Sequence, residues 1–513
     1  MMKINKSIYP YFALLLSCLT YIYTLISFVW IDGLTSFASD SANYMLMALY
    51  LSPWETPSNA IINIWPYQFY PPFYPIVLAL TGAVHSYIAS HVLTTTFLFI
   101  SLPLIFYYSK NIIGHQWHAI FITGLFALSP STFLNTLGIL SENLYILLSF
   151  IILLMFNKLH RFDVKTTILF GFIFSALILT RSIGVSLFAA YLIVGFIQLR
   201  QKKISLQQFS IPIFITITIN LIAKFLNKSI LPTPYLTQLQ SLDISGQPIV
   251  LINTWFTSWQ FYWLDGLHMP NIVLIIVGIL AFIGLIHRTI NFKIDSLYIL
   301  FYLGILLVWP HPGQALRFVY PIFPLLILYS YYAAGVISKG TSVDVRNKII
   351  SLLLLVSYAI VIPTLSFSWN RYQLGKENGY NQIFEFYRFH QIDHAKYIAS
   401  IEKTMFDDMK LIEETTLPDD VIYHFTPAYI ALLANRNSIY LNFGYIGEES
   451  ILMNENKNAD YAYISKLHPR RTGKNYIGDA DLVISFSGET ELLWERFSDE
   501  NGKPISKFFK LNH

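Results

Sequence analysis

The chain is 513 residues long, 54% hydrophobic and only 12% charged, with a formal net charge of +4 and a mean hydropathy of +0.50. About 25% of the residues of a soluble protein are charged, so the composition excludes an ordinary soluble domain. Several apolar runs reach the roughly 20 residues that a helix needs to cross a bilayer, and the alternating segments of a membrane β-barrel are absent. The sequence therefore predicts a polytopic α-helical membrane protein, with no nucleic-acid partner.

The first apolar run, which follows Lys3 and Lys6, is too long for a signal-peptide core and lacks a cleavage site, so we expect an uncleaved first span. Cys18 is the single cysteine, which excludes an intrachain disulfide. Run lengths and charged breaks predict about eleven spans, with a short membrane helix at 73–86 as a further alternative. The predicted spans lie near 9–30, 87–109, 118–137, 142–157, 166–182, 184–199, 208–226, 271–287, 295–310, 318–337 and 349–369.

Basic residues gather in alternate loops, on the side that also holds the N-terminus. By the positive-inside rule this side faces the cytoplasm, so Asp40 and the C-terminal tail are expected outside, at the cytoplasmic (inner) membrane of a bacterium. The basic loop residues are Lys110, Lys158, Arg161, Lys165, Arg200, Lys202, Lys203, Arg288, Lys293, Lys339, Arg346 and Lys348.

After Trp369 the composition becomes polar, aromatic and charged. An amphipathic helical stretch at 393–416 precedes a pattern typical of a β-α-β unit, Val421–Phe425, Pro427–Asn435 and Ser438–Asn442. We therefore predict two domains: a transmembrane domain, 1–369, with an amphipathic first outer loop at 31–86, and a soluble extracytoplasmic α/β domain, 370–513. Further strand candidates are Tyr461–Ser465, Leu482–Ser485, Leu492–Phe497 and Ile505–Lys510.

The first outer loop holds the leading candidate for chemistry, Asp40. Apolar and aromatic residues, among them Tyr44, Met47 and Ala48, recur at three- and four-residue spacing after it, which predicts a helix lying on a surface. A carboxylate at this helix start is either an N-cap or, at the membrane–water boundary, a base that accepts a proton from an acceptor hydroxyl or amine. The loop closes on a proline-rich turn, where Tyr70 is a scaffold residue and a candidate ligand contact.

Two arginines at predicted outer span ends, Arg181 and Arg317, are candidates for binding a donor phosphate. A guanidinium presents a planar fork of donors that matches phosphate oxygens. Each arginine could instead bind Glu142 or helix C-terminal carbonyls. Glu142 opens a span behind the predicted cap Ser141; its acid suits the helix dipole, and it could also orient Arg181 or the acceptor. His311 and Tyr320 are weaker substrate-binding candidates, and Tyr44 of the first outer loop is a further one.

In their order along the chain and in their common location on the predicted outer side, these motifs resemble those of the GT-C membrane glycosyltransferases. The resemblance is greatest to the protein O-mannosyltransferases and the aminoarabinose lipid A transferase. The resemblance covers most of the chain. The motifs that carry it are Asp40-(x3)-Tyr44-(x3)-Ala48, Tyr70-Pro-Pro-Phe-Tyr-Pro75, Leu128-Ser-Pro130, Ser141-Glu142, Leu179-Thr-Arg181-(x2)-Gly184, Arg317-Phe-(x2)-Pro321-(x2)-Pro324, Leu417-Pro-Asp-Asp-Val421 and Ala434-Asn-Arg436.

The resemblance implies a polyprenyl-phosphate sugar donor, inverting transfer on the outer face of the membrane, and a glycan, lipid or protein as the acceptor. Asp40 matches the acid of the family's first loop, the presumed base, and Arg181 and Arg317 match basic positions near the donor phosphate. Many members carry an Asp-Glu pair where this chain has Asp40 and Ser41. We therefore expect no required metal or other cofactor, with a divalent metal as the open alternative.

Three other readings stay open at this stage. A transporter or flippase would show paired repeats and charges near the midplane, whereas here the charges lie at the outer rim. A binding or assembly protein would act through its outer α/β domain. An outer-leaflet oligosaccharide polymerase or ligase would share the topology and the arginines.

Overall fold

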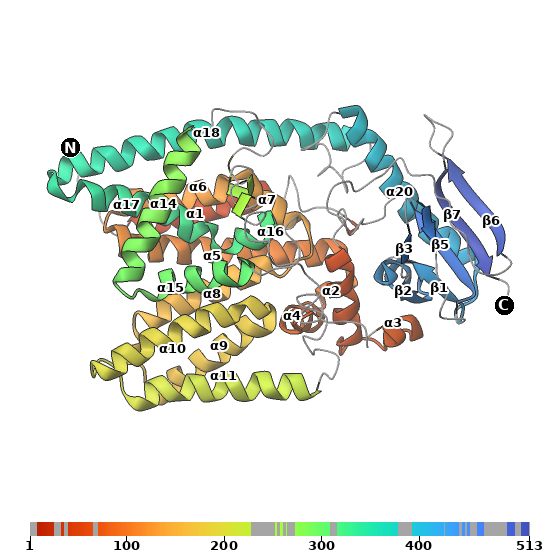
Figure 1. Cartoon of the computed structure of the whole chain (residues 1–513), viewed down its shortest axis with the longest axis horizontal. Helices are drawn as coiled ribbons and strands as arrows, with labels where there is room; N and C mark the ends of the chain where they lie inside the picture. The colour runs from red at the N-terminus through yellow and green to blue at the C-terminus, as the bar shows by residue number, and fades with distance from the viewer. Residues whose placement is uncertain are drawn as a thin grey trace. The chain divides into compact units, whose positions relative to one another are not determined.

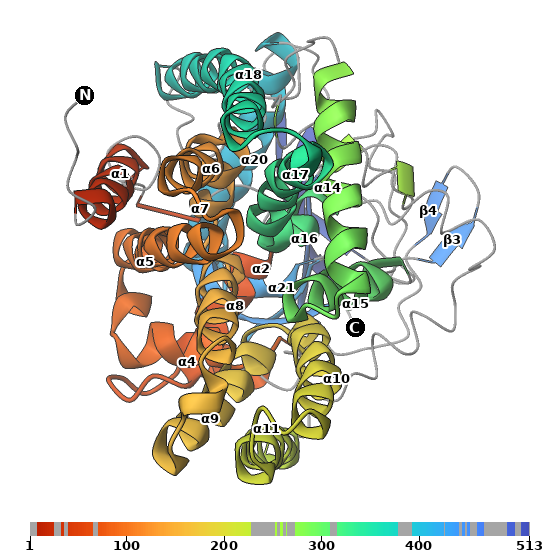
Figure 2. The same cartoon turned by 90° about the vertical axis from the view of Figure 1, so that its left-hand side faces the viewer.

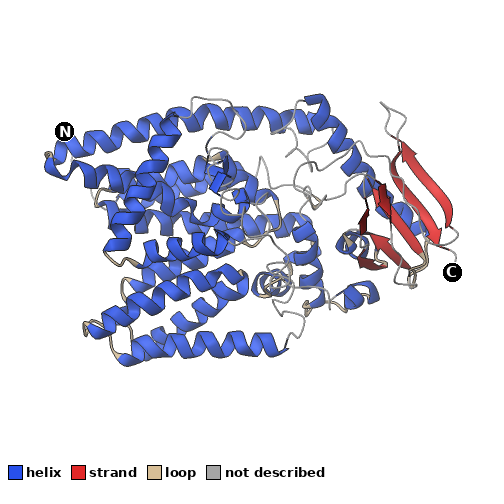
Figure 3. Cartoon of the chain, in the orientation of Figure 1, coloured by secondary structure: helices blue, strands red, loops and turns tan. Residues whose placement is uncertain are grey.

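The computed structural model is mostly helical, and its strands are confined to the C-terminal part of the described chain (Figure 3). The described residues run from 8 to 511 with gaps. Outside them lie 1–7, 25–31, 35–38, 65–69, 227–251, 254–256, 260–262, 264–271, 308–314, 378–391, 425, 441–443, 447–448, 452–458, 466–489, 498–503 and 512–513.

The chain forms two compact units, each contributed by separate stretches of sequence. The first comprises residues 1–32, 69–74 and 88–370, and the second comprises residues 33–68, 75–87 and 371–513. Most of the predicted first outer loop therefore belongs to the same unit as the C-terminal tail. The predicted domain boundary after residue 369 stays a prediction.

The first unit is a bundle of apolar helices (Figure 1). Each of the eleven predicted spans overlaps one of them. Within the described part of the chain, six helical segments are long and apolar enough to cross a membrane. The main helices are α1 (Ile8–Thr24), α5 (Tyr87–Ile113), α6 (Gln116–Leu128), α7 (Pro130–Leu137), α8 (Glu142–Phe156), α9 (Val164–Thr180), α10 (Val185–Arg200), α11 (Leu206–Leu226), α14 (Ile272–Ile290), α15 (Ile294–Leu307), α16 (Ala315–Val319), α17 (Phe323–Ile337) and α18 (Val343–Glu377), whose last residues pass beyond this unit.

The predicted span at 118–137 is divided into two helices, α6 and α7. Ser129 is extended, with a ψ of 133°, and Pro130 begins α7. Proline lacks an amide proton and disfavours helical geometry in the residue before it, so the Leu128-Ser-Pro130 motif ends the first helix and begins the second.

Neighbouring helices in the bundle approach closely. Helix α14 packs along α17, α9 along α11, and α10 along α15 (Figure 2). A side chain at Gly284 of α14 would place its Cβ 2.4 Å from the backbone oxygen of Tyr329 of α17. Glycine at this position is therefore required for the α14–α17 contact.

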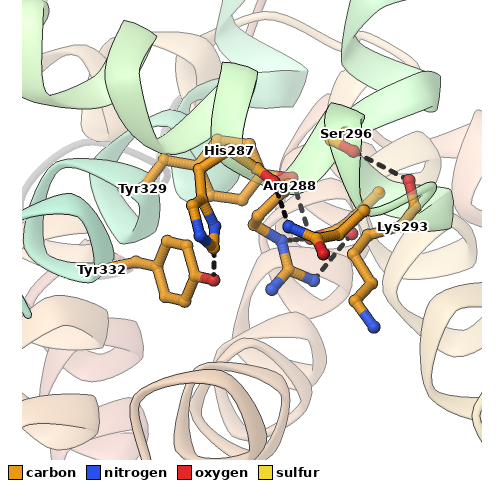
Figure 4. A network of polar contacts seen from close by, with 8 residues as sticks. His287, Arg288, Lys293, Ser296, Tyr329 and Tyr332 are labelled. Atoms are coloured by element: carbon orange, nitrogen blue, oxygen red, sulfur yellow. Dashed lines mark hydrogen bonds and ion pairs between the residues drawn. The ribbon is translucent and has the colours of Figure 1, made fainter. Parts of the chain in front are cut away.

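A buried ion pair joins α14 to α15 across their short connection (Figure 4). Arg288 donates two hydrogen bonds of 2.8 Å to Asp295, which also accepts one of 2.7 Å from the Tyr329 hydroxyl. The Arg288 guanidinium lies over the rings of Tyr329 and Tyr332, and Tyr332 is hydrogen-bonded to His287 at 3.0 Å. The cluster satisfies a charge pair that would otherwise be costly inside an apolar bundle.

Removing one partner of this pair leaves a buried charge. We expect Asp295→Ala to lower the free energy of unfolding of the first unit by roughly 3–5 kcal/mol. The double variant Arg288→Met/Asp295→Leu should recover most of that loss, because it removes both charges and keeps apolar volume. Thermal unfolding of the purified full chain in nanodiscs measures the stability of the single and the double variant. A double variant no more stable than the single one would contradict the explanation.

The second unit contains a five-stranded mixed sheet in the order β2-β1-β5-β7-β6. Strands β1, β2 and β5 are parallel, and β7 is antiparallel to β5 and β6. The described elements are α2 (Ser39–Tyr50), α3 (Asn59–Ile64), α4 (Phe73–Leu80, which begins in the first unit), the 3₁₀ turn η3 (Ala83–His85), α20 (Ile392–Thr415), β1 (Val421–His424), α21 (Pro427–Tyr429), the π-helix η9 (Ile430–Ala434), β2 (Asn437–Tyr440), β5 (Tyr461–Ser465), β6 (Thr490–Phe497), β7 (Pro504–Leu511), and a separate hairpin, β3 (Gly444–Ile446) and β4 (Glu449–Ile451).

The predicted β-α-β unit is confirmed by β1, the helical segment α21–η9 and β2, which pairs with β1 in parallel. Three further predicted strands correspond to β5, β6 and β7, whereas the predicted strand at Leu482–Ser485 lies outside the described residues. The β3–β4 hairpin was not predicted.

Helix α2 confirms the predicted helix, with Asp40 in its first turn, but its predicted place on a surface is wrong. From Ser41 to Ala48 every residue except Asn43 is buried. The helix itself carries small and apolar side chains on nearly all of its sides. A helix of this kind is stable only when other parts of the protein cover it.

A buried carboxylate, Asp408, joins α20 to the sheet. It accepts hydrogen bonds from Tyr463 at 2.9 Å, Ser506 at 2.5 Å and Arg496 at 3.3 Å. Burial raises the pKa of Asp408 above its ordinary value, although the three donors oppose this shift. Since the folded state binds the proton more tightly than the unfolded state does, protonation of this group stabilises the fold.

The second unit should therefore gain stability from Asp408 as the pH falls from 7 towards the ordinary aspartate pKa of about 3.9, and lose it as the pH rises through the raised pKa. Asp408→Asn should remove this part of the pH dependence. Hydrogen exchange of the β5 and β7 amides from pH 4 to 7, corrected for intrinsic rates, measures it. An Asn variant with an unchanged pH profile would contradict the assignment.

Candidate active site

The first unit brings together three of the predicted site residues. Glu142 is the first residue of α8 and fully buried, Arg181 directly follows α9, and Arg317 lies in α16. Arg181 Nη1 lies 2.6 Å from Glu142 Oε1, and Arg317 Nε donates to the same oxygen. One carboxylate thus holds two guanidinium groups that are far apart in sequence.

Phe318 lies beside both arginines. The Arg181 guanidinium carbon is 5.4 Å from the centroid of its ring, and that of Arg317 is 6.0 Å from it. Tyr302 of α15 donates a hydrogen bond of 2.5 Å to the Phe318 carbonyl. The aromatic ring attracts both cations, and the tyrosine fixes the backbone next to Arg317.

A second link runs beside the ion cluster, along the same two segments. Tyr320, in the 3₁₀ turn η7 (Tyr320–Ile322), donates a hydrogen bond of 2.9 Å to Asn143, the neighbour of Glu142. Asn143 donates to the Thr94 carbonyl at 3.4 Å, and the Thr94 hydroxyl meets that of Tyr74 at 2.6 Å. The proline-rich turn that contains Tyr74 is therefore tied to the α8–α16 contact.

Local sequence explains how these groups come to the site. Arg181 ends α9, where a cation is favoured by the helix dipole, and Glu142 begins α8, where an anion is favoured. Gly184 donates from its amide to the Arg181 carbonyl at 2.8 Å and closes a tight turn after the arginine. Ser141 occupies the N-cap position without a side-chain cap bond, so its predicted capping role is wrong; its hydroxyl accepts from Arg181 Nη1 at 3.4 Å.

The other predicted residues are placed as follows. Asp40 is partly exposed and Tyr44 buried in α2 of the second unit, and Tyr70 is partly buried in the first unit. Tyr320 is fully buried in its contact with Asn143. His311 lies outside the described residues.

Sequence reasoning missed Asn143, Phe318 and Tyr302. Asn143 and Phe318 directly follow the predicted residues Glu142 and Arg317, and this adjacency could have pointed to them. Tyr302 lies within an apolar span, and nothing in the sequence pattern marks it as a site residue. Among the described residues, no three histidine, cysteine or acidic side chains come together in a way that could hold a metal ion.

Glu142 should be required for the geometry of this cluster. Glu142→Ala leaves two guanidinium groups facing each other in a partly buried site, which we expect to cost roughly 3–5 kcal/mol of unfolding free energy. Glu142→Gln keeps an acceptor oxygen and should lose less unfolding free energy than Glu142→Ala. Thermal unfolding in nanodiscs tests this order; equal stability of wild type and Glu142→Ala would show that the carboxylate does not hold the arginines.

Residues 256–395, which include Arg317, match the model of the Alg9-like mannosyltransferase family. No curated protein sequence is detectably similar to the chain.

Several solved structures are similar to the chain at low sequence identity. The oligosaccharyltransferase of Archaeoglobus fulgidus, solved with a tethered acceptor peptide, matches with a TM-score of 0.52 and 11% identity over 85% of this chain. AglB from the same organism, in complex with an inhibitory peptide and a dolichol-phosphate, matches with a TM-score of 0.53 and 11% identity over 85% of this chain. In both cases 64% of the other chain is covered, so this chain spans less than two thirds of their length. ArnT from Cupriavidus metallidurans matches with a TM-score of 0.48 and 11% identity, covering 84% of this chain and 86% of its own.

The oligosaccharyltransferase structures have the GT-C architecture, and the partial family match falls in the same class of enzymes. The chain is therefore a membrane protein with the fold of the GT-C glycosyltransferases.

Proposed function

We propose that the protein transfers a sugar from a polyprenyl-phosphate donor to an acceptor on the outer face of the membrane, with inversion at the anomeric carbon. The observation that carries this proposal is the pairing of Arg181 and Arg317 on the buried Glu142. A buried carboxylate and two arginines within an apolar bundle are costly to maintain, and this cost motivates a functional hypothesis for them.

The arginine pair suits a lipid phosphate. Each guanidinium has five donors in a rigid fork, so its contact with Glu142 does not exhaust it. Two guanidinium groups on one carboxylate bring several N–H donors to one place, a geometry that suits phosphate oxygens. In this partly buried setting a phosphate contact is stronger than it would be in water.

The comparisons support the class of donor. The family match is to mannosyltransferases and includes Arg317, which favours mannose as the sugar. AglB, which shares the fold, was solved with a dolichol-phosphate, a polyprenyl-type lipid phosphate. The acceptor belongs to one of three classes: glycan, lipid or protein.

Asp40 is the proposed base. It removes the proton from an acceptor hydroxyl or amine, and the acceptor atom attacks the sugar C1 from the side opposite the phosphate. The bond between C1 and the phosphate oxygen breaks, and both of its electrons leave with the polyprenyl phosphate. The arginines stabilise the negative charge that develops on this leaving group, and this stabilisation lowers the barrier.

The charge of the loops supports the proposed orientation, with the N-terminus in the cytoplasm and Asp40 outside. An inner membrane of a bacterium is the proposed location. Among the described residues, no observation favours a flippase over a transferase.

Donor binding and turnover test the two roles separately. The full chain in nanodiscs is incubated with synthetic mannosyl undecaprenyl phosphate, and the bound fraction is measured by native mass spectrometry. Arg317→Ala should weaken binding about 10- to 100-fold, which corresponds to about 1.4 to 2.7 kcal/mol from a charge-assisted hydrogen bond, and Arg317→Lys should weaken it less. Arg200→Ala, at an exposed helix end, is the matched control and should bind like wild type.

Asp40→Asn should bind the donor like wild type and lose roughly 10²- to 10⁴-fold in turnover. Turnover is followed as transfer of radiolabelled mannose to endogenous acceptors in membrane vesicles that contain the protein.

Equal donor affinity in Arg317→Ala and Arg200→Ala would reject the phosphate site. Wild-type turnover in Asp40→Asn would reject the base.

A further inference from the structure

The helix that carries Asp40 belongs structurally to the C-terminal tail. Helix α2 lies in residues 33–68, which form one compact unit with residues 371–513. Within this unit α2 contacts α21 and the π-helix η9, and α3 contacts β2 and η9. The tail thus supplies the surface on which both loop helices pack.

A side-chain hydrogen bond joins the loop to the sheet. Asn63 Nδ2, in α3, donates to Asn437 Oδ1, in β2, at 2.8 Å. Asn437 in turn donates from its own amide to the Asp419 carbonyl at 3.2 Å. Asn437 is therefore held on one side by the tail and on the other by the loop.

The surface beneath the loop helices is firmly built. Arg436, the neighbour of Asn437, is buried and donates to the Thr416 hydroxyl and to carbonyls at the ends of α20 and η9. A cation at two helix C-termini satisfies their free carbonyls and suits both dipoles. Ser438 also donates to the Pro427 carbonyl at 2.7 Å, which fixes α21 to β2.

The loop helices need such support. Helix α2 has 12 residues and α3 has six, and isolated helices of this length are marginal in water. Their stability comes from tertiary packing. Any movement of their support therefore moves the side chain of Asp40, and a misplacement of about 1 Å can cost 10²-fold in rate.

We infer that the C-terminal domain positions the base: Asn437 and the α21–η9 segment hold the α3 and α2 helices, and through them Asp40. This inference rests on the proposed function, because it assigns Asn437 as a positioning residue for that reaction. It predicts that a defect in the tail lowers turnover without changing donor affinity, since the arginines lie in the first unit.

The test compares Asn437→Ala with Asn437→Asp in the full chain. The Asp variant keeps the oxygen that accepts from Asn63, and the Ala variant does not. Asn437→Ala should speed hydrogen exchange in residues 41–64 and lower turnover at saturating mannosyl undecaprenyl phosphate, each by roughly three- to tenfold, the effect of one hydrogen bond. Asn437→Asp loses, like Asn437→Ala, the amide that donates to the Asp419 carbonyl but keeps the acceptor for Asn63, so it should restore part of both losses. Both variants should bind the donor like wild type.

Lys510→Ala is the matched control, because Lys510 is exposed on β7, three strands away from β2. It should leave exchange in residues 41–64 and turnover unchanged. Arg436→Lys keeps the positive charge but loses the planar fork of donors. It should speed exchange in residues 41–64 and lower turnover more than Asn437→Ala does.

Unchanged exchange in residues 41–64 of Asn437→Ala would overturn the inference, as would faster exchange with wild-type turnover. A loss of donor affinity in Asn437→Ala would also overturn it. The proposed function fails in a different way, through wild-type turnover of Asp40→Asn, so the two failures are distinguishable.

Discussion

One carboxylate, Glu142, holds two arginines in a place where water is scarce, and the candidate site in the bundle depends on this contact. The three residues come from α8, α9 and α16, and no short-range contact would bring them together. Removal of water strengthens the attraction between opposite charges and raises the cost of leaving any of them unmatched. The aromatic ring of Phe318 packs against the arginines, and hydrogen bonds from Tyr302 and Tyr320 hold the neighbouring backbone and side chains in place.

The bundle uses the same arrangement a second time with a different result. Arg288 and Asp295 form a balanced pair, one cation to one anion, enclosed by tyrosine rings and hydroxyls. The Glu142 cluster instead brings two guanidinium groups to one carboxylate oxygen, so their N–H donors are gathered in one place. The first pair is a structural joint between neighbouring helices, and the second is the better candidate for binding a phosphate.

Sequence reasoning located the helices well because hydropathy follows directly from the bilayer. It also named Glu142, Arg181 and Arg317, since charged residues at span ends are conspicuous. It could not state that both arginines meet one oxygen, which depends on packing between α8, α9 and α16. Arg288 was counted as a loop charge, whereas α14 continues past it and Asp295 lies inside α15. Burial of α2 was also missed, because hydrophobic spacing identifies a helix and leaves open what covers it.

The bond between Asn63 and Asn437 spans 374 positions of the chain. At a synthesis rate of about 5–20 residues per second, roughly 20 to 75 seconds separate the two residues at the ribosome. During that interval the first spans are already made, while the short helices of the loop have no partner to fold against. The second unit can therefore be completed only near the end of synthesis, and the loop helices stay without their packing surface until then.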